Sequence, residues 1–363
     1  MALNQVYRCS VCGGELSWDA AAHSMKCPYC DSTFTMEEME AQGRTELHED
    51  NYEVGQNAQD LGYTESTDDS DVKPEDLRVY KCRHCAAEII TDKNTAATTC
   101  VYCGNPVVIE EQLVNGFTPK WVIPFRVTQD KIKEKYLSHI KKLFTPDSFM
   151  TDQHIQKIKG VYIPFWLYDA EVNGSISYDA ETSSSRRSGD YRITTHKVYD
   201  VDRTGELEYK RIPADASSKT DNNIMDSIEP FNYEDLVKFE MPYLAGFYAE
   251  KYDEDAKTCE NRIVTRIRKT FKDEMANTVT GYDKKNITSE SINHHIKKAD
   301  YSMLPVYLLY TKYNNKDYIF AMNGQTGKMT GNIPIDPGKV IKFVLGTGSV
   351  LSIIATLLFL FIL

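Results

Sequence analysis

The sequence predicts a mixed α+β protein with two zinc ribbons at its N-terminus, a duplicated globular domain and one transmembrane helix at its C-terminus. Three observations support this prediction. Eight cysteines form two sets of equal spacing, the middle of the chain repeats an order of apolar strands and helices, and the last 21 residues carry no charge. We therefore divide the 363 residues into five segments: 1–36, 37–78, 79–112, 113–338 and 339–363.

The eight cysteines have the spacing of two four-thiolate zinc sites. Both sets follow the pattern C-x₂-C-x₁₄-C-x₂-C, and the second set lies 73 positions after the first. Four thiolates fill the tetrahedral shell of Zn²⁺ and leave no position for water, so we expect two structural sites and no catalytic metal. The predicted ligands are Cys9, Cys12, Cys27 and Cys30 in the first ribbon, and Cys82, Cys85, Cys100 and Cys103 in the second.

Each ribbon is short enough that bound metal, rather than apolar burial, is expected to stabilise it. The residue after the second cysteine of a zinc knuckle often needs a positive φ. Gly13 and Gly104 suit that need, Asp31 tolerates it, and Ala86 fits less well. Short strands are expected at Glu15–Trp18 with His23–Lys26, and at Glu88–Thr91 with Ala97–Cys100.

Two further expectations follow for the ribbons. Metal removal should unfold the first ribbon without changing the melting of the middle domain, because each small module carries its own source of stability. Disulfides are the alternative use of eight cysteines. The absence of a secretory signal before them and the repeated spacing both favour metal.

The acidic excess of the chain lies in the segment between the ribbons. The protein has a net charge of −11, and residues 37–78 alone carry fourteen acidic and three basic side chains. With few bulky apolar residues, this segment is expected to be a flexible, self-repelling spacer. The alternative is a recruitment peptide for a basic partner.

The C-terminal segment has the length and composition of a transmembrane helix. Phe343–Leu363 would extend about 31 Å as a helix, which is one hydrocarbon core. Lys339 and Lys342 precede it, and positive charge favours the cytoplasmic side of a membrane. We therefore expect a single-pass protein of the cell membrane with a cytoplasmic N-terminus. A buried core helix is the alternative.

The middle domain is expected to contain two copies of a strand–helix–strand–strand unit. In the first, the strand Trp121–Val127 precedes a helix at 130–144, a short helix at 152–159 and a strand at 160–168. In the second, an extended segment at 242–250 precedes a helix at 253–275 and strands at 304–313 and 317–322. Between the copies, 194–202 and 205–212 are expected to form a hairpin that turns at Arg203–Gly205.

The two longer helices carry basic faces. The second also has an apolar stripe at helical spacing, formed by Val264, Ile267, Phe271 and Met275. Solvated faces opposite a buried stripe are the simpler interpretation, and contact with anionic lipid is the alternative. The basic residues are Lys131, Lys133, Lys135, Lys141 and Lys142 in the first helix, and Arg262, Arg266, Arg268, Lys269 and Lys272 in the second.

Catalytic motifs are not found. The sequence contains no Walker-type phosphate loop, dinucleotide glycine pattern, H-E-x-x-H or G-x-S-x-G. His294 and His295 are adjacent on a segment expected to be helical, so their side chains point in different directions and make a poor joint metal site. Asp169 with Glu171 is weak support for acid–base chemistry. The ninth cysteine, Cys259, is expected to be a buried or idle thiol. We therefore predict no enzymatic activity and no catalytic residue, although an unrecognised site in the middle domain is the enzyme alternative.

The tetracysteine ribbon, the run VYIPFWLYDAEV at 161–172 and the terminal apolar helix together resemble a bacterial family. This family comprises the membrane-anchored TFIIB-type zinc-ribbon proteins of Gram-positive bacteria, and the chain is similar to the zinc-ribbon membrane protein of a PspA-type membrane-stress operon. The resemblance implies a membrane-tethered adaptor that recruits cytoplasmic proteins in a stress response. Nucleic-acid binding is the alternative, and the negative charge of both ribbons weighs against it.

Overall fold

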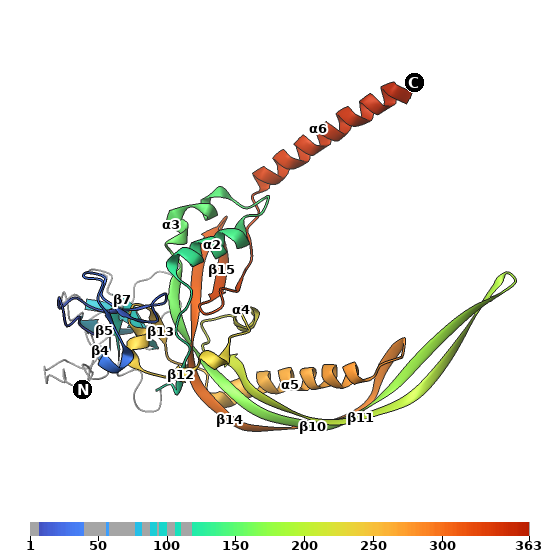
Figure 1. The fold of residues 1–363 in the computed structure, drawn as a ribbon. Coiled ribbons are helices and arrows are strands. Elements are labelled where there is room, and N and C mark those ends of the chain that lie inside the picture. The colour runs from blue at the N-terminus through green and yellow to red at the C-terminus, as the bar shows by residue number, and fades with distance from the viewer. Residues whose placement is uncertain are drawn as a thin grey trace.

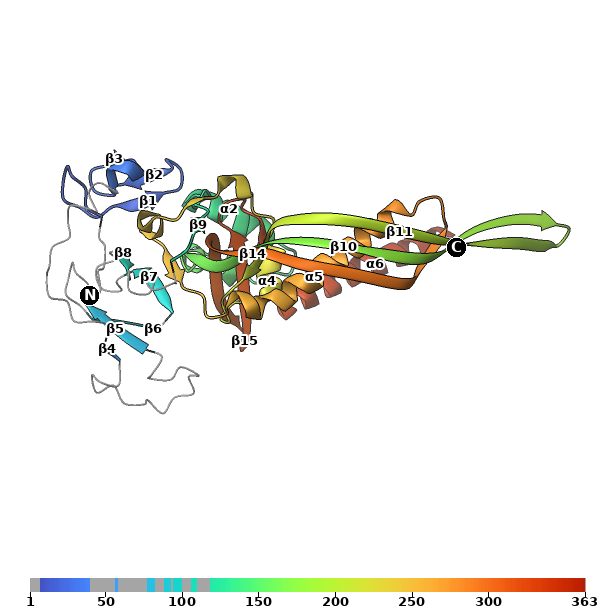
Figure 2. The same ribbon diagram turned by 90° about the horizontal axis from the view of Figure 1, so that it is seen from below.

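The protein is a mixed α+β molecule from which one long helix projects (Figure 1). The structure is a computed structural model, and it describes residues 7–39, 56–57, 77–81, 88–92, 94–99, 106–109 and 118–362. The N-terminal strands lie at one end, and a long curved sheet and the helix α6, Pro337–Ile362, both leave the middle domain toward the opposite side (Figures 1 and 2). α6 therefore forms in the segment that the sequence predicts to be helical.

The first ribbon contains a small antiparallel sheet. Its strands are β1 (Ser17–Asp19), β2 (Ser24–Lys26) and β3 (Thr33–Phe34), in the order β1-β2-β3. Trp18 lies opposite Met25, and His23 turns the chain between them with a φ of 50°. The two strands expected in this ribbon therefore pair as predicted, within a residue or two at their ends.

The next part of the chain departs from the expected pairing. We expect β6 (Glu88–Asp92) to pair with β7 (Thr95–Thr99), but β6 pairs with β5 (Leu77–Lys81), and β7 pairs with β8 (Pro106–Val108) and β13 (Tyr248–Glu250). The small, buried side chains of β7 allow the middle domain to approach it closely. Of the predicted acidic spacer, the structure describes residues 37–39, the strand β4 (Gln56–Asn57) and 77–78; the remainder lies outside the described residues.

The middle domain follows the predicted order of elements with altered lengths. Its first half contains β9 (Trp121–Val122), α2 (Gln129–Ile140), η4 (Asp147–Met150), α3 (Asp152–Ile155), β10 (Lys159–Ser188) and β11 (Tyr191–Asp215). A connection follows with α4 (Asn222–Ser227), η5 (Tyr233–Asp235), β12 (Val237–Lys238) and η6 (Met241–Leu244). The second half contains β13, α5 (Ala256–Thr278), β14 (Lys284–Tyr313), β15 (Lys316–Asn323) and β16 (Met329–Gly331).

The strand order of the large sheet is symmetric between the two halves. β10 and β14 pair antiparallel at the centre, β9 lies parallel to β14, and β13 lies parallel to β10. Each central strand also pairs with the strand that follows it in the chain, β10 with β11 and β14 with β15. Pro164 lies opposite Met303 and Pro305 lies opposite Tyr162, so Ile163 opposite Leu304 marks the centre. If each residue of one half is replaced by its counterpart in the other half, the same pairs of residues lie opposite each other.

The longest feature is an arm made of 165–215 from β10 and β11 and 284–302 from β14 (Figure 1). The predicted turn at Arg203–Gly205 is wrong: β11 runs straight through it, and the hairpin turns at 189–190. Gly205 serves a different purpose, since a Cβ there would lie 2.7 Å from Cε of Met275 in α5. The glycine allows a helix to pack closely on the strand, which a sequence pattern does not distinguish from a turn.

α5 covers one face of the arm. Asp255 accepts a hydrogen bond from the Thr258 backbone N–H at 2.7 Å and caps the helix. The buried stripe contains Ile267, Phe271 and Met275 as predicted, together with Cys259 and Ile263, whereas Val264 is only half-buried. We name the covered side the α5 face and the other side the open face.

Four of the five cations expected on the basic face of α5 form ion pairs within the chain, and Lys269 is exposed. Arg262 lies 2.8 Å from the fully buried Asp215, Arg266 pairs with Glu229, and Lys272 lies 2.6 Å from Glu290. These cations hold the helix to the arm and to the connection that precedes it. They are therefore not free to bind a surface elsewhere.

A buried histidine lies in the aromatic cluster between α2, α3 and β15. The ring of His154 lies 4.5 Å from that of Phe149 and 6.1 Å from that of Tyr136. Its Nε2 atom has no hydrogen-bond partner within the part of the chain that the structure describes. Burial lowers the pKa of His154 below its ordinary value of 6.5, so the ring is neutral at neutral pH.

His154 should make the middle domain less stable in acid. The His154 ring takes up a proton more readily in the unfolded chain than in the folded one. The contribution of the neutral ring to the free energy of unfolding is therefore fully present above about pH 6.5, and it is lost as pH falls toward the lowered pKa of the folded state. Denaturation of detergent-solubilised protein at pH 7.5 and 5.5 measures the difference. His154→Leu should reduce it and the exposed His295→Gln should not; equal pH dependence in all three proteins would contradict the assignment.

Candidate metal centre

Two tight knuckles bring the first four cysteines together. In the first, the Gly13 backbone N–H donates to the Cys9 carbonyl at 2.8 Å, and in the second the Asp31 N–H donates to the Cys27 carbonyl at 3.0 Å. Gly13 has a φ of 74° and Asp31 a φ of 60°, which confirms the positive values predicted for both. The repeated turn explains why each pair of cysteines presents its two sulfurs in the same direction.

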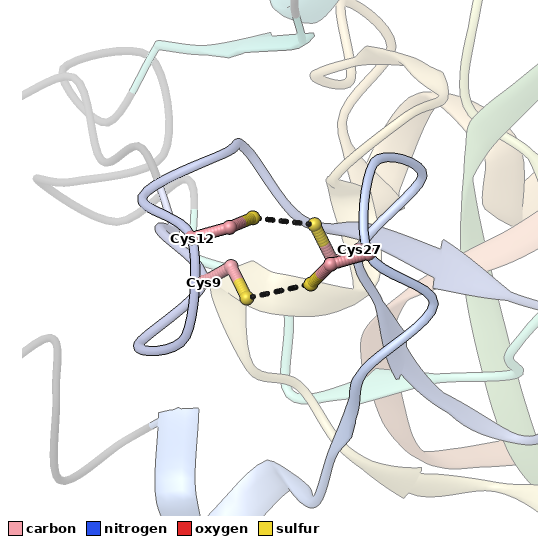
Figure 3. Close-up of side chains that lie close together, drawn as sticks. Cys9, Cys12 and Cys27 are labelled. Carbon is pink, nitrogen blue, oxygen red and sulfur yellow. Dashed lines mark hydrogen bonds between the residues drawn. The ribbon is translucent and has the colours of Figure 1, made fainter.

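The four sulfurs form one compact group. The Sγ atoms of Cys9, Cys12, Cys27 and Cys30 all lie within 4.8 Å of one another. Two of the contacts, Cys9 to Cys30 and Cys12 to Cys27, are 3.5 Å, which is far longer than the 2.05 Å or so of a disulfide. Figure 3 shows Cys9 and Cys12 on one knuckle facing Cys27 on the other. The first predicted set of ligands is therefore brought together.

The donor set fits Zn²⁺. Zinc–sulfur bonds of about 2.3 Å in a tetrahedral shell place the sulfurs about 3.8 Å apart, close to the spacing found here. Hydrogen bonding to Ser32, through its side chain and its backbone, lowers the pKa of Cys30 to about 6 and favours the thiolate that binds metal. All four ligand positions would be filled by protein, so the site suits a structural metal.

Comparison with known proteins places the chain in a family. The uncharacterized protein YdjG of Bacillus subtilis (strain 168) is 33% identical to this chain over 240 residues, which are 66% of this chain and 70% of YdjG. The chain belongs to the YdjG family. No protein-family model matches this YdjG homologue, and no solved structure matches it.

The ribbon of this YdjG homologue packs directly on the middle domain. The ring of Trp18 lies 4.9 Å from that of Tyr243, and its Nε1–H donates to the Phe125 carbonyl at 3.3 Å. The Trp18 backbone N–H also donates to the Ala245 carbonyl at 3.1 Å. Buried residues of both parts, Cys9 and Cys27 included, belong to one apolar cluster. Because the ribbon and the middle domain share one core, we expect them to unfold together rather than independently.

The second predicted set of ligands lies outside the described residues, as do the positions Ala86 and Gly104. This applies to Cys82, Cys85, Cys100 and Cys103 alike. Of the segment predicted to form the second ribbon, the structure describes residues in β5, β6, β7 and β8 and the neighbouring Asn94 and Ile109.

The other residues considered from the sequence are buried, paired or placed on a strand. His294 and His295 lie on β14 and not on a helix as expected. Cys259 is buried at the start of α5, where burial raises its pKa to about 12 and leaves it a neutral thiol at neutral pH. Asp169 and Glu171 do share a face, as expected, but each forms an ion pair with a lysine, Lys298 and Lys297 respectively. Sequence reasoning missed the buried Asp215, because its partner Arg262 is distant in the chain.

Removing the metal should destabilise both parts of the shared core. Chelation or Cys27→Ser should lower the melting temperature of the middle domain as well as unfold the ribbon. The expected loss is about 3–5 kcal/mol of unfolding free energy, the range for removing a buried large aromatic contact. Thermal denaturation, with the zinc content of the same samples measured in parallel, tests this loss. Trp18→Ala should give a similar loss with zinc retained; an unchanged melting temperature in zinc-free protein would contradict the coupling.

Proposed function

We propose that this protein is a membrane-tethered zinc-ribbon adaptor that recruits cytoplasmic protein partners, in keeping with a role in membrane stress. The observation that carries the proposal is α6. Its segment Pro337–Thr356 has a mean hydropathy of 1.5, is long enough to span a membrane, and has no part buried against the rest of the described chain. An apolar helix of this length left uncovered needs lipid or another protein around it.

The first turns of α6 contact the middle domain, although none of their residues is buried. Asp336 Oδ1 accepts the backbone N–H of Gly338 at 2.8 Å, and Pro337 begins the helix. Lys339 Nζ lies 2.6 Å from Asp147, and the Phe343 ring contacts that of Phe144 at 5.4 Å. These contacts would hold the domain close to the membrane surface.

Cations gather where α6 would enter the membrane. Lys141 and Lys142 follow α2 and are exposed, and they directly precede the segment that contacts Phe343. With Lys339 and Lys342, they support a cytoplasmic position for the domain. They also support contact with anionic lipid at the end of α2, in contrast to the paired cations of α5.

The metal sites would be architectural. The second cysteine set has the spacing of the first, so we infer that both bind zinc and that neither is catalytic. The nucleic-acid alternative gains no support from the first ribbon, because its Lys26 pairs with Asp31 at 3.0 Å and is not offered to phosphate. We also infer that the middle domain is a duplicated unit, which the symmetric register of β10 and β14 supports.

Truncation after Asp336 tests the tether. The shortened protein should be released from cell membranes at physiological salt, while the full-length protein should resist extraction by carbonate. Flotation on a density gradient measures this. Continued flotation of the truncated protein after a salt wash would contradict α6 as the anchor.

The adaptor role is tested with the same two proteins. Chemical crosslinking and pull-down from membranes should recover a soluble protein with the full-length chain, and the truncated chain should bring the same protein into the soluble fraction. Recovery of nucleic acid in place of protein would overturn the proposal.

A further inference from the structure

The end of the arm is a cationic and aromatic surface. We define the tip as residues 184–197, all of which are exposed. It contains Asp190 as its one acidic residue, whereas its cations are Arg186, Arg187, Arg192 and Lys197. Tyr191 is 78% exposed, and Ile193 is 41% exposed. The tip is therefore net positive in a protein whose net charge is −11.

Within the described structure, the cations of the tip lack the ion pairs that cations elsewhere in the arm form, and Arg187 Nε–H donates to a backbone carbonyl, that of Gly189, at 3.3 Å. Arg187 lies directly opposite Arg192 on the open face, an arrangement in which like charges repel. The ion pairs found in the described structure include neither of these residues, nor Arg186 or Lys197. At the base of the arm, by contrast, Lys297 pairs with two glutamates. An anion from outside the chain would relieve the repulsion at the tip.

The tip also extends beyond its structural support. α5 ends at Thr278, and β14 begins at Lys284, opposite Glu181. Asp283 accepts a hydrogen bond from the Ser183 hydroxyl at 2.8 Å. From there to the end of the arm, the described structure contains only the two strands β10 and β11. A two-stranded hairpin is marginally stable in water. Contact with a surface would therefore order this segment.

The direction of the arm identifies the surface. The tip and α6 leave the middle domain toward the same side in both views (Figures 1 and 2). The 25 residues of β11 span about 80 Å, about twice the roughly 39 Å of the 26-residue α6. The arm is thus long enough to reach the bilayer well away from the point where α6 enters it.

We propose that the tip is a second membrane contact, in which its arginines and lysine bind anionic phospholipid headgroups and Tyr191 and Ile193 enter the interface. Arginine, lysine and tyrosine are the residues that favour this layer of a bilayer. The inference rests on the proposed function, because α6 must first bring the protein to a membrane.

Photocrosslinking in the full-length protein tests the contact. Tyr191→p-benzoylphenylalanine is reconstituted into vesicles of phosphatidylcholine alone or with 30% phosphatidylglycerol, irradiated and analysed by mass spectrometry for lipid adducts. Tyr29→p-benzoylphenylalanine is the matched control, because Tyr29 is 68% exposed on the zinc ribbon at the other end of the molecule. We expect adducts at position 191 in the vesicles that contain phosphatidylglycerol, fewer without it, and none at position 29.

Charge reversal tests the role of the arginines. Arg187→Glu with Arg192→Glu should lower the adduct yield at position 191 about tenfold or more, as should high salt. Lys238→Glu with Lys269→Glu makes the same change of charge at exposed residues away from the tip and should leave the yield unchanged.

Three results would overturn the inference: no lipid adduct at position 191, equal yields with and without phosphatidylglycerol, or adducts in native membranes that join the tip to a protein instead of lipid. Failure of the tether gives a different result, because the protein would then not float with the vesicles at all. Protein that floats without an adduct at position 191 contradicts the tip contact alone.

Discussion

The antiparallel pairing of β10 with β14 is the interaction on which the rest of the molecule depends. It joins the two halves of the middle domain at Ile163 and Leu304, and it continues through two register shifts, after Asp169 and after Ser177, to Glu181 and Lys284 in the arm. Each remaining strand of the large sheet attaches to this pair directly or through one or two neighbouring strands. A change of register here would move apolar side chains of β10 from the α5 face to the open face, so the buried stripe of α5 fixes the pairing.

Burial in the arm is one-sided, which explains its composition. Tyr168, Val172 and Ile176 point toward α5, while Asp169, Glu171 and Asn173 lie on the open face. Two glycines permit the closest approaches. A Cβ at Gly174 would lie 2.4 Å from the Ser291 carbonyl oxygen, as one at Gly205 would meet Met275. The arm is therefore held by packing on one side and by ion pairs on the other.

Local features of the sequence predicted local features of the structure. The ligands Cys9, Cys12, Cys27 and Cys30, the positive φ of Gly13 and the helical segments that became α5 and α6 all follow from spacing and composition. Long-range features did not follow. The length of β11 was missed because Gly205 resembles a turn residue, and the contact of Trp18 with Tyr243 joins segments far apart in sequence. The second cysteine set stays a prediction.

The contacts at the base of α6 have a mechanical consequence. Lys339 and Phe343 contact the segment after α2 within the first two turns of the helix, and these contacts oppose a hinge between helix and domain. A helix that leans by ten degrees would then swing the far end of an arm about 80 Å long through roughly 14 Å. Mismatch between bilayer thickness and helix length is one influence on how far a membrane helix leans. In the membrane orientation proposed above, the fold would act as a lever in which a small change in the tilt of α6 changes how closely the arm tip approaches the bilayer.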